Sequence, residues 1–197
     1  MRSAEIDNRT ATLKPTIRNT DDIPADDLLE RARRVRLLLM DCDGVLTDGR
    51  LQLTADDEQK TFHARDGQGI SLIHRAGLRT GIISGRKSSA VERRAHDLKM
   101  SFVHQFAKDK IKSLEEITSA AGVSIDECAY IGDDLADIAL MRRVGLAVAV
   151  ADAVAETKAV AHYVTNLNGG SGAVREVCEL ILKAQGRWAE LLEDFNQ

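Results

Sequence analysis

The chain has 197 residues, of which 44% are hydrophobic and 4% aromatic, and it carries a formal net charge of −4. This length suits one domain, or one domain with a tail, and the core must be built mainly from aliphatic side chains. The negative charge argues against nucleic acid as the main partner. It does not exclude an anionic substrate, because a binding site needs only a local positive field.

Cysteine usage and hydropathy together favour a cytoplasmic protein. The three cysteines, Cys42, Cys128 and Cys178, are widely spaced and form no CxxC pair. This pattern is typical of reduced thiols rather than of a disulfide framework or a zinc site. No apolar run approaches the length of a membrane helix, and the first ten residues do not resemble a signal peptide. We therefore expect a soluble, cytoplasmic protein with no membrane partner.

The hydrophobic pattern predicts strands and helices in alternation. Residues 1–23 are polar and aperiodic and are expected to form a flexible arm, residues 24–190 a single domain, and residues 191–197 a tail. A helix is expected over 25–34, and a strand buried on both faces over 35–40. The later strands are expected at 78–84, 101–103, 128–131, 145–150 and 163–165, and the later helices at 87–98, 108–121, 135–144 and 173–188.

This alternation is typical of an α/β fold with a doubly wound, parallel, Rossmann-like sheet. Residues 49–64 interrupt it and are expected to form a small β-hairpin, with its turn at 55–58. The hairpin is too short to be a large cap domain, although it could cover the mouth of a site. Ligands of such sheets bind at the carboxyl ends of the strands.

Acidic residues follow two of the predicted strands. Asp41 and Asp43 come directly after the first strand, so one carboxylate can attack phosphorus while the other handles the leaving-group proton. Asp133, Asp134 and Asp137 follow a later strand. Clustered carboxylates repel one another unless a cation neutralises them, and hard oxygen ligands indicate Mg²⁺. Asp134 and Asp137 could equally cap a helix, which leaves Asp133 as the stronger metal candidate.

Two further positions suit phosphate binding. Ser84, followed by Gly85 and Arg86, offers a hydroxyl and backbone amides at the start of a helix. Lys110, near the start of another helix, can balance the charge of the nucleophile and of a transferring phosphoryl group. Each of these residues taken alone would be read as an ordinary cap or a surface lysine. The four elements in this order favour a phosphatase.

The same motifs carry a resemblance to a known family. The order DxDG, Ser, Lys and GDDxxD resembles the haloacid dehalogenase-like phosphatases. The segments DCDGVLTDG, KTFHARDGQGI, IISGRK, YIGDDLADIALMRRVGLAVAV and YVTNLNGGSGAVREVCELIL are similar to the 3-deoxy-D-manno-octulosonate 8-phosphate phosphatases. This narrower resemblance covers residues 35–185.

The resemblance implies roles for individual residues. Asp41 would be the nucleophile, Asp43 the general acid and base, and Ser84 and Lys110 would hold the phosphoryl oxygens. Mg²⁺ would be bound by the Asp41 carboxylate, the Asp43 main-chain carbonyl and Asp133, with Asp134 in support and Asp137 farther out. The family also implies a homotetramer without a large cap, in which a neighbouring subunit helps to close each site, and a place in lipopolysaccharide precursor synthesis.

Recognition of the sugar acid is expected to involve arginines. Arg65 and Arg86 lie in matching motifs and suit a planar carboxylate. Arg175 and Glu58 are further candidates. Arg65 and Arg175 could instead form structural ion pairs, and Glu58 could be an exposed residue of the hairpin turn. The chain departs from the family pattern at four places: Phe106 and Asp57 replace glycines, Ala139 replaces a proline, and Val154-Ala155 replaces His-Pro.

Three other readings fit parts of the sequence. A phosphatase for a related nine-carbon sugar acid 9-phosphate would use the same chemistry. A receiver-like signalling domain also places acids, a Ser or Thr and a Lys around Mg²⁺, but Asp43 favours rapid hydrolysis over a lasting phosphorylated state. A non-catalytic subunit would have no need of the acids and Lys110. None of the five histidines shows ligand spacing, and we assign no metal to them.

Overall fold

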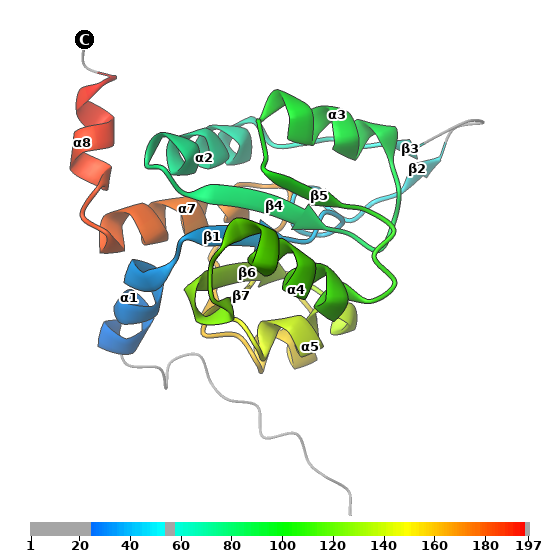
Figure 1. Ribbon diagram of the computed structural model, residues 1–197. Helices are drawn as coiled ribbons and strands as arrows, with labels where there is room; N and C mark the ends of the chain where they lie inside the picture. Colours follow the sequence, from blue (N-terminus) through cyan, green and yellow to red (C-terminus); the bar gives the residue numbers. More distant parts are fainter. Residues whose placement is uncertain (1–24, 54–57, 196–197) are drawn as a thin grey trace, which may run out of the picture.

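The computed structural model describes residues 25–53 and 58–195. Its centre is a six-stranded sheet in which every neighbouring pair of strands is parallel (Figure 1). The strand order is β5 (Phe102–His104), β4 (Arg79–Ile83), β1 (Leu37–Met40), β6 (Cys128–Gly132), β7 (Leu146–Ala149) and β8 (Tyr163–Val164). The predicted doubly wound parallel sheet is therefore confirmed.

Helices cover both faces of this sheet. On one face, α2 (Ala64–Arg75) packs against α7 (Ala173–Ala184), and α7 also contacts α1 (Ala25–Arg34). The helix α2 connects β1 to β4, whereas α4 (Lys110–Ala121) connects β5 to β6 and so runs along the sheet in the opposite direction. Because such connections are right-handed, α4 lies on the other face of the sheet. There α4 contacts α5 (Ile138–Met141) (Figure 1). The remaining helices are α3 (Ser89–Asp97), α6 (Ala155–Lys158) and α8 (Trp188–Glu193).

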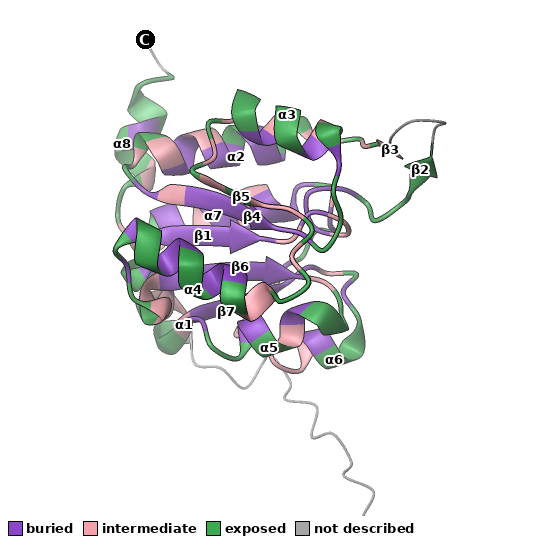
Figure 2. Ribbon diagram, turned by 45° about the vertical axis from the view of Figure 1, so that its right-hand side comes forward, coloured by how far each residue is buried: buried purple, intermediate pink, exposed green. Residues whose placement is uncertain are grey.

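The central strands are buried on both faces, as their apolar runs predict. All four residues of β1 and all five of β6 are buried (Figure 2). Cys42, Cys128 and Cys178 are also buried, and each is a free thiol. No helix in the described part of the chain is long and apolar enough to span a bilayer.

The predicted hairpin is present as two short antiparallel strands, β2 (Gln52–Leu53) and β3 (Glu58–Gln59). It projects from the carboxyl end of the sheet, beyond the helical layers (Figure 2). Its turn lies outside the described residues, as does the arm predicted for residues 1–23 and the departure from the family pattern at residue 57.

Several helical segments differ from the sequence prediction, including the short α6, which was not expected. The helix α2 was not predicted, because Gly67 and Gly69 lower its intrinsic propensity. A Cβ at Gly69 would lie 3.1 Å from the Cα of Arg175, so this glycine allows α2 and α7 to approach closely. The helix expected over 135–144 is a 3₁₀ turn (Leu135–Asp137) followed by the short α5.

The helix expected over 173–188 is also divided. It ends at Ala184, and Gly186 adopts φ of +70° in the turn that precedes α8. Because α8 extends from Trp188 to Glu193, the first residues of the expected tail are helical. The positive φ favours glycine, which explains where the helix breaks.

Candidate active site

The sheet register brings the candidate catalytic residues to one edge. Met40 at the end of β1 pairs with Ile82 of β4 on one side and with Ile131 of β6 on the other. Asp41 follows β1 directly, and Ser84 and Asp133 follow β4 and β6. The backbone N–H of Asp41 donates to the carbonyl of Ile131 at 3.0 Å, which extends this alignment past the strand. The carboxyl ends of three adjacent strands therefore carry the predicted motifs.

The acids of the first and fourth motifs converge on a space of ion size. Carboxylate oxygens of Asp41, Asp133 and Asp137 all lie within 4.8 Å of one another. Asp133 Oδ1 is buried and accepts no hydrogen bond from the described residues. Asp41 Oδ1 lies 3.2 Å from Lys110 Nζ, but this contact lacks hydrogen-bond geometry, so we treat it as an ion pair. Two buried carboxylate oxygens that accept no hydrogen bond are suited to bind a divalent cation.

Both carboxylate oxygens of Asp137 accept hydrogen bonds within this cluster. Its Oδ1 accepts from Lys110 Nζ at 2.7 Å and from the Tyr130 hydroxyl at 2.7 Å. Its Oδ2 accepts the backbone N–H of Asp133 at 3.0 Å. Asp137 and Tyr130 are fully buried, so these bonds fix Lys110 beside Asp41. Tyr130 could not be assigned to the site from sequence, because its ring fits a buried strand equally well.

Gly44 allows Asp133 to reach the loop that carries Asp41. A Cβ at position 44 would lie 2.1 Å from Asp133 Oδ2, which is far inside contact distance. Gly44 also adopts φ of +86°, a conformation that side chains disfavour. The glycine of the first motif is thus required both by the turn and by the neighbouring carboxylate.

Burial and charge repulsion shift the carboxyl groups toward protonation. Burial raises the pKa of Asp41 to about 6, with Lys110 opposing this shift and Asp137 adding to it. Burial, then the charges of Asp41 and Asp137, raise the pKa of Asp133 to about 7. The pKa of Lys110 is raised by Asp41 and Asp137 despite its desolvation, so the ammonium stays charged. The negative charge of the cluster thus exceeds what its lysine can balance.

These shifts predict how the metal-free protein responds to pH. A carboxyl group with a raised folded-state pKa binds its proton more tightly in the folded chain, so its contribution to stability is lost as pH rises. For Asp41 and Asp133 the loss falls between about pH 4 and pH 7. Asp133→Asn removes one of the repelling charges. In EDTA at pH 8 we expect this variant to have a free energy of unfolding about 2 kcal/mol higher than wild type.

Urea denaturation at pH 5 and pH 8, with and without Mg²⁺, would measure this effect. Mg²⁺ should stabilise wild type at pH 8 by mass action and should stabilise Asp133→Asn far less. Glu156→Gln on α6, an exposed position, is the matched control for loss of one negative charge. A variant less stable than wild type in EDTA at pH 8 would contradict the pKa assignment of Asp133.

A second charged network links the hairpin to the first motif. Lys60 Nζ contacts Asp43 Oδ1 and lies 3.1 Å from Glu58 Oε2, and its side chain is only 2% exposed. Arg86 contacts the same two acids, through Nη2 to Glu58 and through Nε at 3.8 Å to Asp43. Lys60 was missed from the sequence, where a lysine in a polar hairpin is typical of solvated surface. Its burial against Asp43 makes it a further candidate residue of the site.

The other predicted residues divide into those near the site and those engaged elsewhere. Ser84 is 2% exposed at the end of β4, and its Oγ accepts from Arg86 N at 3.3 Å. Arg65 is exposed in the first turn of α2, and no ion pair joins it to the described residues. Arg175 Nε donates to Glu179 at 2.8 Å, and its guanidinium covers the ring of Trp188.

Two of the predicted residues make other contacts in this structure. Arg175 forms the structural ion pair that was the alternative reading, because Glu179 at i+4 and Trp188 hold its side chain along α7. Asp134 is exposed and caps the 3₁₀ turn by accepting from Leu135 N at 2.7 Å, and it is not among the carboxylates that converge with Asp41. The candidate metal site thus keeps Asp41 and Asp133 as its carboxylate ligands.

Phe106, which departs from the family pattern, has a backbone conformation that favours glycine. Phe106 adopts φ of +55°, the left-handed conformation in which the family usually has glycine. Its ring is 62% exposed, and the ammonium of Lys108 lies 5.2 Å from the ring centroid. Farther along, the N–H of Val154 donates to the Asp133 carbonyl at 2.9 Å, so the altered loop there supports the metal-site backbone.

Comparisons with known proteins find related phosphatases. Residues 106–177 match a family model described as haloacid dehalogenase-like hydrolase. The chain is 43% identical over 164 residues to the 3-deoxy-D-manno-octulosonate 8-phosphate phosphatase KdsC of Yersinia pestis, covering 83% of this chain and 88% of the relative. For the same enzyme of Escherichia coli K12 the identity is 41% over 165 residues, with the same coverage.

Solved structures give the same result. The crystal structure of 3-deoxy-D-manno-octulosonate 8-phosphate phosphatase from Moraxella catarrhalis, in complex with magnesium ion, phosphate ion and a KDO molecule, superposes with a TM-score of 0.85 at 39% identity. The match covers 87% of this chain and 99% of that one. Sequence and structure thus agree over most of both proteins. The chain belongs to the 3-deoxy-D-manno-octulosonate 8-phosphate phosphatase family of the haloacid dehalogenase-like hydrolases.

Proposed function

We propose that this phosphatase hydrolyses 3-deoxy-D-manno-octulosonate 8-phosphate to the free sugar acid and phosphate, through a phospho-aspartate on Asp41. The observation that carries the proposal is the convergence of Asp41, Asp133 and Lys110 at the carboxyl edge of the sheet. The curated relatives from Yersinia pestis and Escherichia coli are named for this activity. A place in lipopolysaccharide precursor synthesis, in the cytoplasm, is part of the same proposal.

The first step is an in-line attack of the Asp41 carboxylate on phosphorus while Asp43 donates a proton to the sugar alkoxide. In the second step Asp43 takes a proton from water, which hydrolyses the aspartyl phosphate. Lys110, held by Asp137 and Tyr130, faces the phosphoryl oxygens beside Asp41, and Ser84 supplies a hydroxyl from the end of β4. Positioning and charge stabilisation supply most of the rate enhancement.

The carboxylates of Asp41 and Asp133, with the main-chain carbonyl of Asp43, would hold Mg²⁺. The cation would neutralise the acids and draw charge from the phosphoryl oxygens. The unpaired Asp133 Oδ1 supports this assignment. The Moraxella catarrhalis relative contains a magnesium ion and a phosphate ion.

Recognition of the sugar acid is proposed for Arg65 and Arg86, with Glu58 beside them. Arg86 contacts both Glu58 and Asp43, which places a guanidinium next to the proposed general acid. Arg65 is exposed, with no ion pair in the described chain, and can reach a molecule beyond its own subunit. We propose a homotetramer in which the projecting hairpin and a neighbouring subunit help to close each site.

Phosphate release from a panel of sugar phosphates, with Mg²⁺ or with EDTA, tests this function. We expect turnover of the eight-carbon sugar acid 8-phosphate only with Mg²⁺, and a kcat/KM at least tenfold lower for the nine-carbon 9-phosphate. The reverse preference would establish the nine-carbon alternative. The receiver-like and non-catalytic readings lose their support, because the chain belongs to a phosphatase family.

A further inference from the structure

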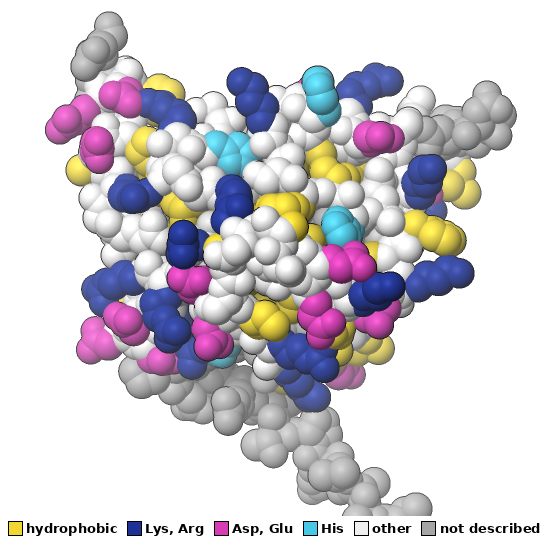
Figure 3. Space-filling model, in the orientation of Figure 1, with side chains coloured by type: hydrophobic (Ala, Val, Ile, Leu, Met, Phe, Trp, Pro, Cys, Tyr) yellow, Lys and Arg dark blue, Asp and Glu magenta, His cyan; other side chains and the backbone are white. Residues whose placement is uncertain are grey.

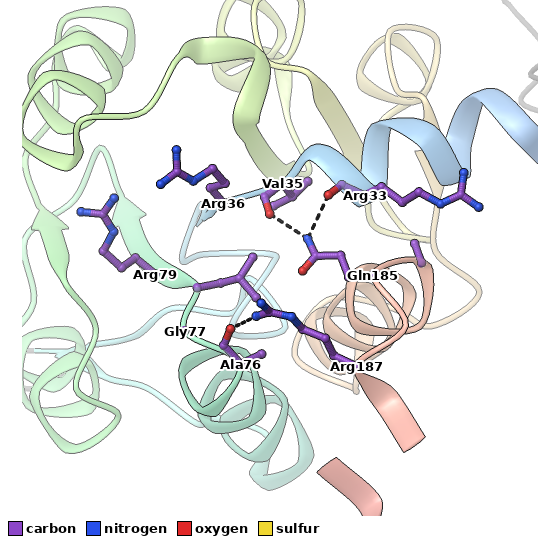
Figure 4. A pocket seen from close by; sticks show the side chains of 10 residues that line it. Arg33, Val35, Arg36, Ala76, Gly77, Arg79, Gln185 and Arg187 are labelled. Atoms are coloured by element: carbon purple, nitrogen blue, oxygen red, sulfur yellow. Dashed lines mark hydrogen bonds between the residues drawn. The ribbon is translucent and has the colours of Figure 1, made fainter. Parts of the chain in front are cut away.

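A cleft of about 550 Å³ lies at the edge of the sheet where β1 and β4 begin (Figure 4). Arg36 precedes β1 and Arg79 opens β4, while Arg33 comes from the last turn of α1 and Arg187 from the turn before α8. Because the strands are parallel, their first residues lie at the far end of the sheet from Asp41. The cleft is therefore separate from the candidate active site.

The charge of this cleft is unusual for the chain. Four arginines from four segments line it, and none of its described lining residues is acidic, although the whole chain carries a net charge of −4. Convergence of like charges is unfavourable unless an opposite charge balances it. The balance must come from elsewhere in the protein or from a bound anion.

Part of the balance comes from helix ends. Arg187 Nη1 donates to the Ala76 carbonyl beyond the last turn of α2 (Figure 4). Arg79 Nη2 donates to the Ala121 carbonyl at the end of α4. Cations at helix C-termini are favourable. Each contact uses one N–H of a guanidinium that has five, so donors remain for a ligand while the guanidinium is held in place.

The acidic partners of the other two arginines are weak. Arg36 Nη1 lies 3.4 Å from Glu127 Oε1, and the Arg36 side chain is 60% exposed while that of Glu127 is 29% exposed. Arg33 Nη1 lies 3.5 Å from Glu30, and both side chains are more than half exposed. Exposed pairs of this kind contribute little and are readily exchanged for a stronger anion. The remaining positive charge is therefore available to a ligand.

The walls of the cleft add an apolar surface. Val35 and Leu78 are nearly buried, and Gln185 is fixed beside them by its Nε2 bond to the Val35 carbonyl at 2.8 Å. The volume falls within the range of about 300–1,000 Å³ typical of small-molecule sites. A single phosphate would leave most of it unfilled. Guanidinium groups bind phosphate oxygens in pairs, and apolar walls suit an organic portion.

We propose that this cleft binds an organic polyphosphate, of the class of nucleoside di- and triphosphates, independently of the active site. Isothermal titration of the full chain in EDTA, with adenosine 5′-(β,γ-imido)triphosphate as the probe, tests the proposal. EDTA leaves the acidic active site without its cation, so that it repels anions. We expect one molecule bound per chain, and at least tenfold weaker binding to an Arg36→Gln/Arg187→Gln variant.

Arg93→Gln, at an exposed position of α3, is the matched control for lost charge and should bind as wild type does. Arg36→Gln alone, which removes no helix cap, should weaken binding severalfold even if the double variant folds poorly. The proposal is wrong if the Kd of the probe is weaker than about 1 mM. It is also wrong if these variants bind the probe as tightly as Arg93→Gln does. Equal affinity for inorganic phosphate would also overturn it.

Discussion

Asp41→Asn is expected to abolish turnover while leaving the fold intact. The change removes the nucleophilic oxygen but keeps the shape of the side chain, and asparagine does not attack phosphorus. Loss of a residue that forms the covalent intermediate should reduce kcat by at least about 10⁴-fold. Phosphate release under saturating substrate and Mg²⁺ measures the effect, and the far-ultraviolet circular dichroism spectrum should match wild type.

The same variant gives a second, independent result. Because burial raises the pKa of Asp41 to about 6, its charge is costly in the metal-free protein, and asparagine should not lower stability at pH 8 in EDTA. Deamidation back to aspartate must be excluded by mass spectrometry. Full activity in a sample shown to contain asparagine would refute the assignment of the nucleophile.

Lys60→Met is expected to have the second largest effect, on both the hairpin and catalysis. Lys60 is almost fully buried between Asp43 and Glu58, so methionine removes the cation that these two partly buried carboxylates share. Removing one partner of a buried pair costs about 3 kcal/mol or more. We expect kcat/KM to fall by about 100-fold, since that free energy acts on the position of the proposed general acid.

Steady-state kinetics and hydrogen exchange of the hairpin amides would measure these two effects. Lys112→Met, at a side chain that is 72% exposed, is the matched control and should be close to wild type in both. Lys60→Arg restores the charge and should recover part of the activity. A Lys60→Met enzyme with normal kcat/KM would show that the network serves only the fold.

The parts of the structure that were predictable from sequence are those in which one local pattern fixes the outcome. The apolar run that ends at Met40 identifies a buried strand, and the acids that follow it must lie at the carboxyl edge of a parallel sheet. Asp133 was predictable for the same reason. The register of β1 with β6 then brings the two acids together without further information.

The features that were not predictable depend on contacts between distant segments. The burial of Lys60 arises because the hairpin folds onto the loop after β1, and nothing in the neighbouring residues marks it. The side chain of Arg175 could point toward the site or along its helix, and the contacts with Glu179 and Trp188 decide between them. The helix α2 was obscured by Gly67 and Gly69, and of these Gly69 allows close packing against α7.

The absence of a side chain at position 44 couples the loop after β1 to the loop after β6. The carboxylate after β6 occupies the volume that any other residue at position 44 would fill. The position of this carboxylate therefore depends on a residue that supplies no ligand of its own. Gly44→Ala should displace the Asp133 carboxylate and lower the affinity for the cation.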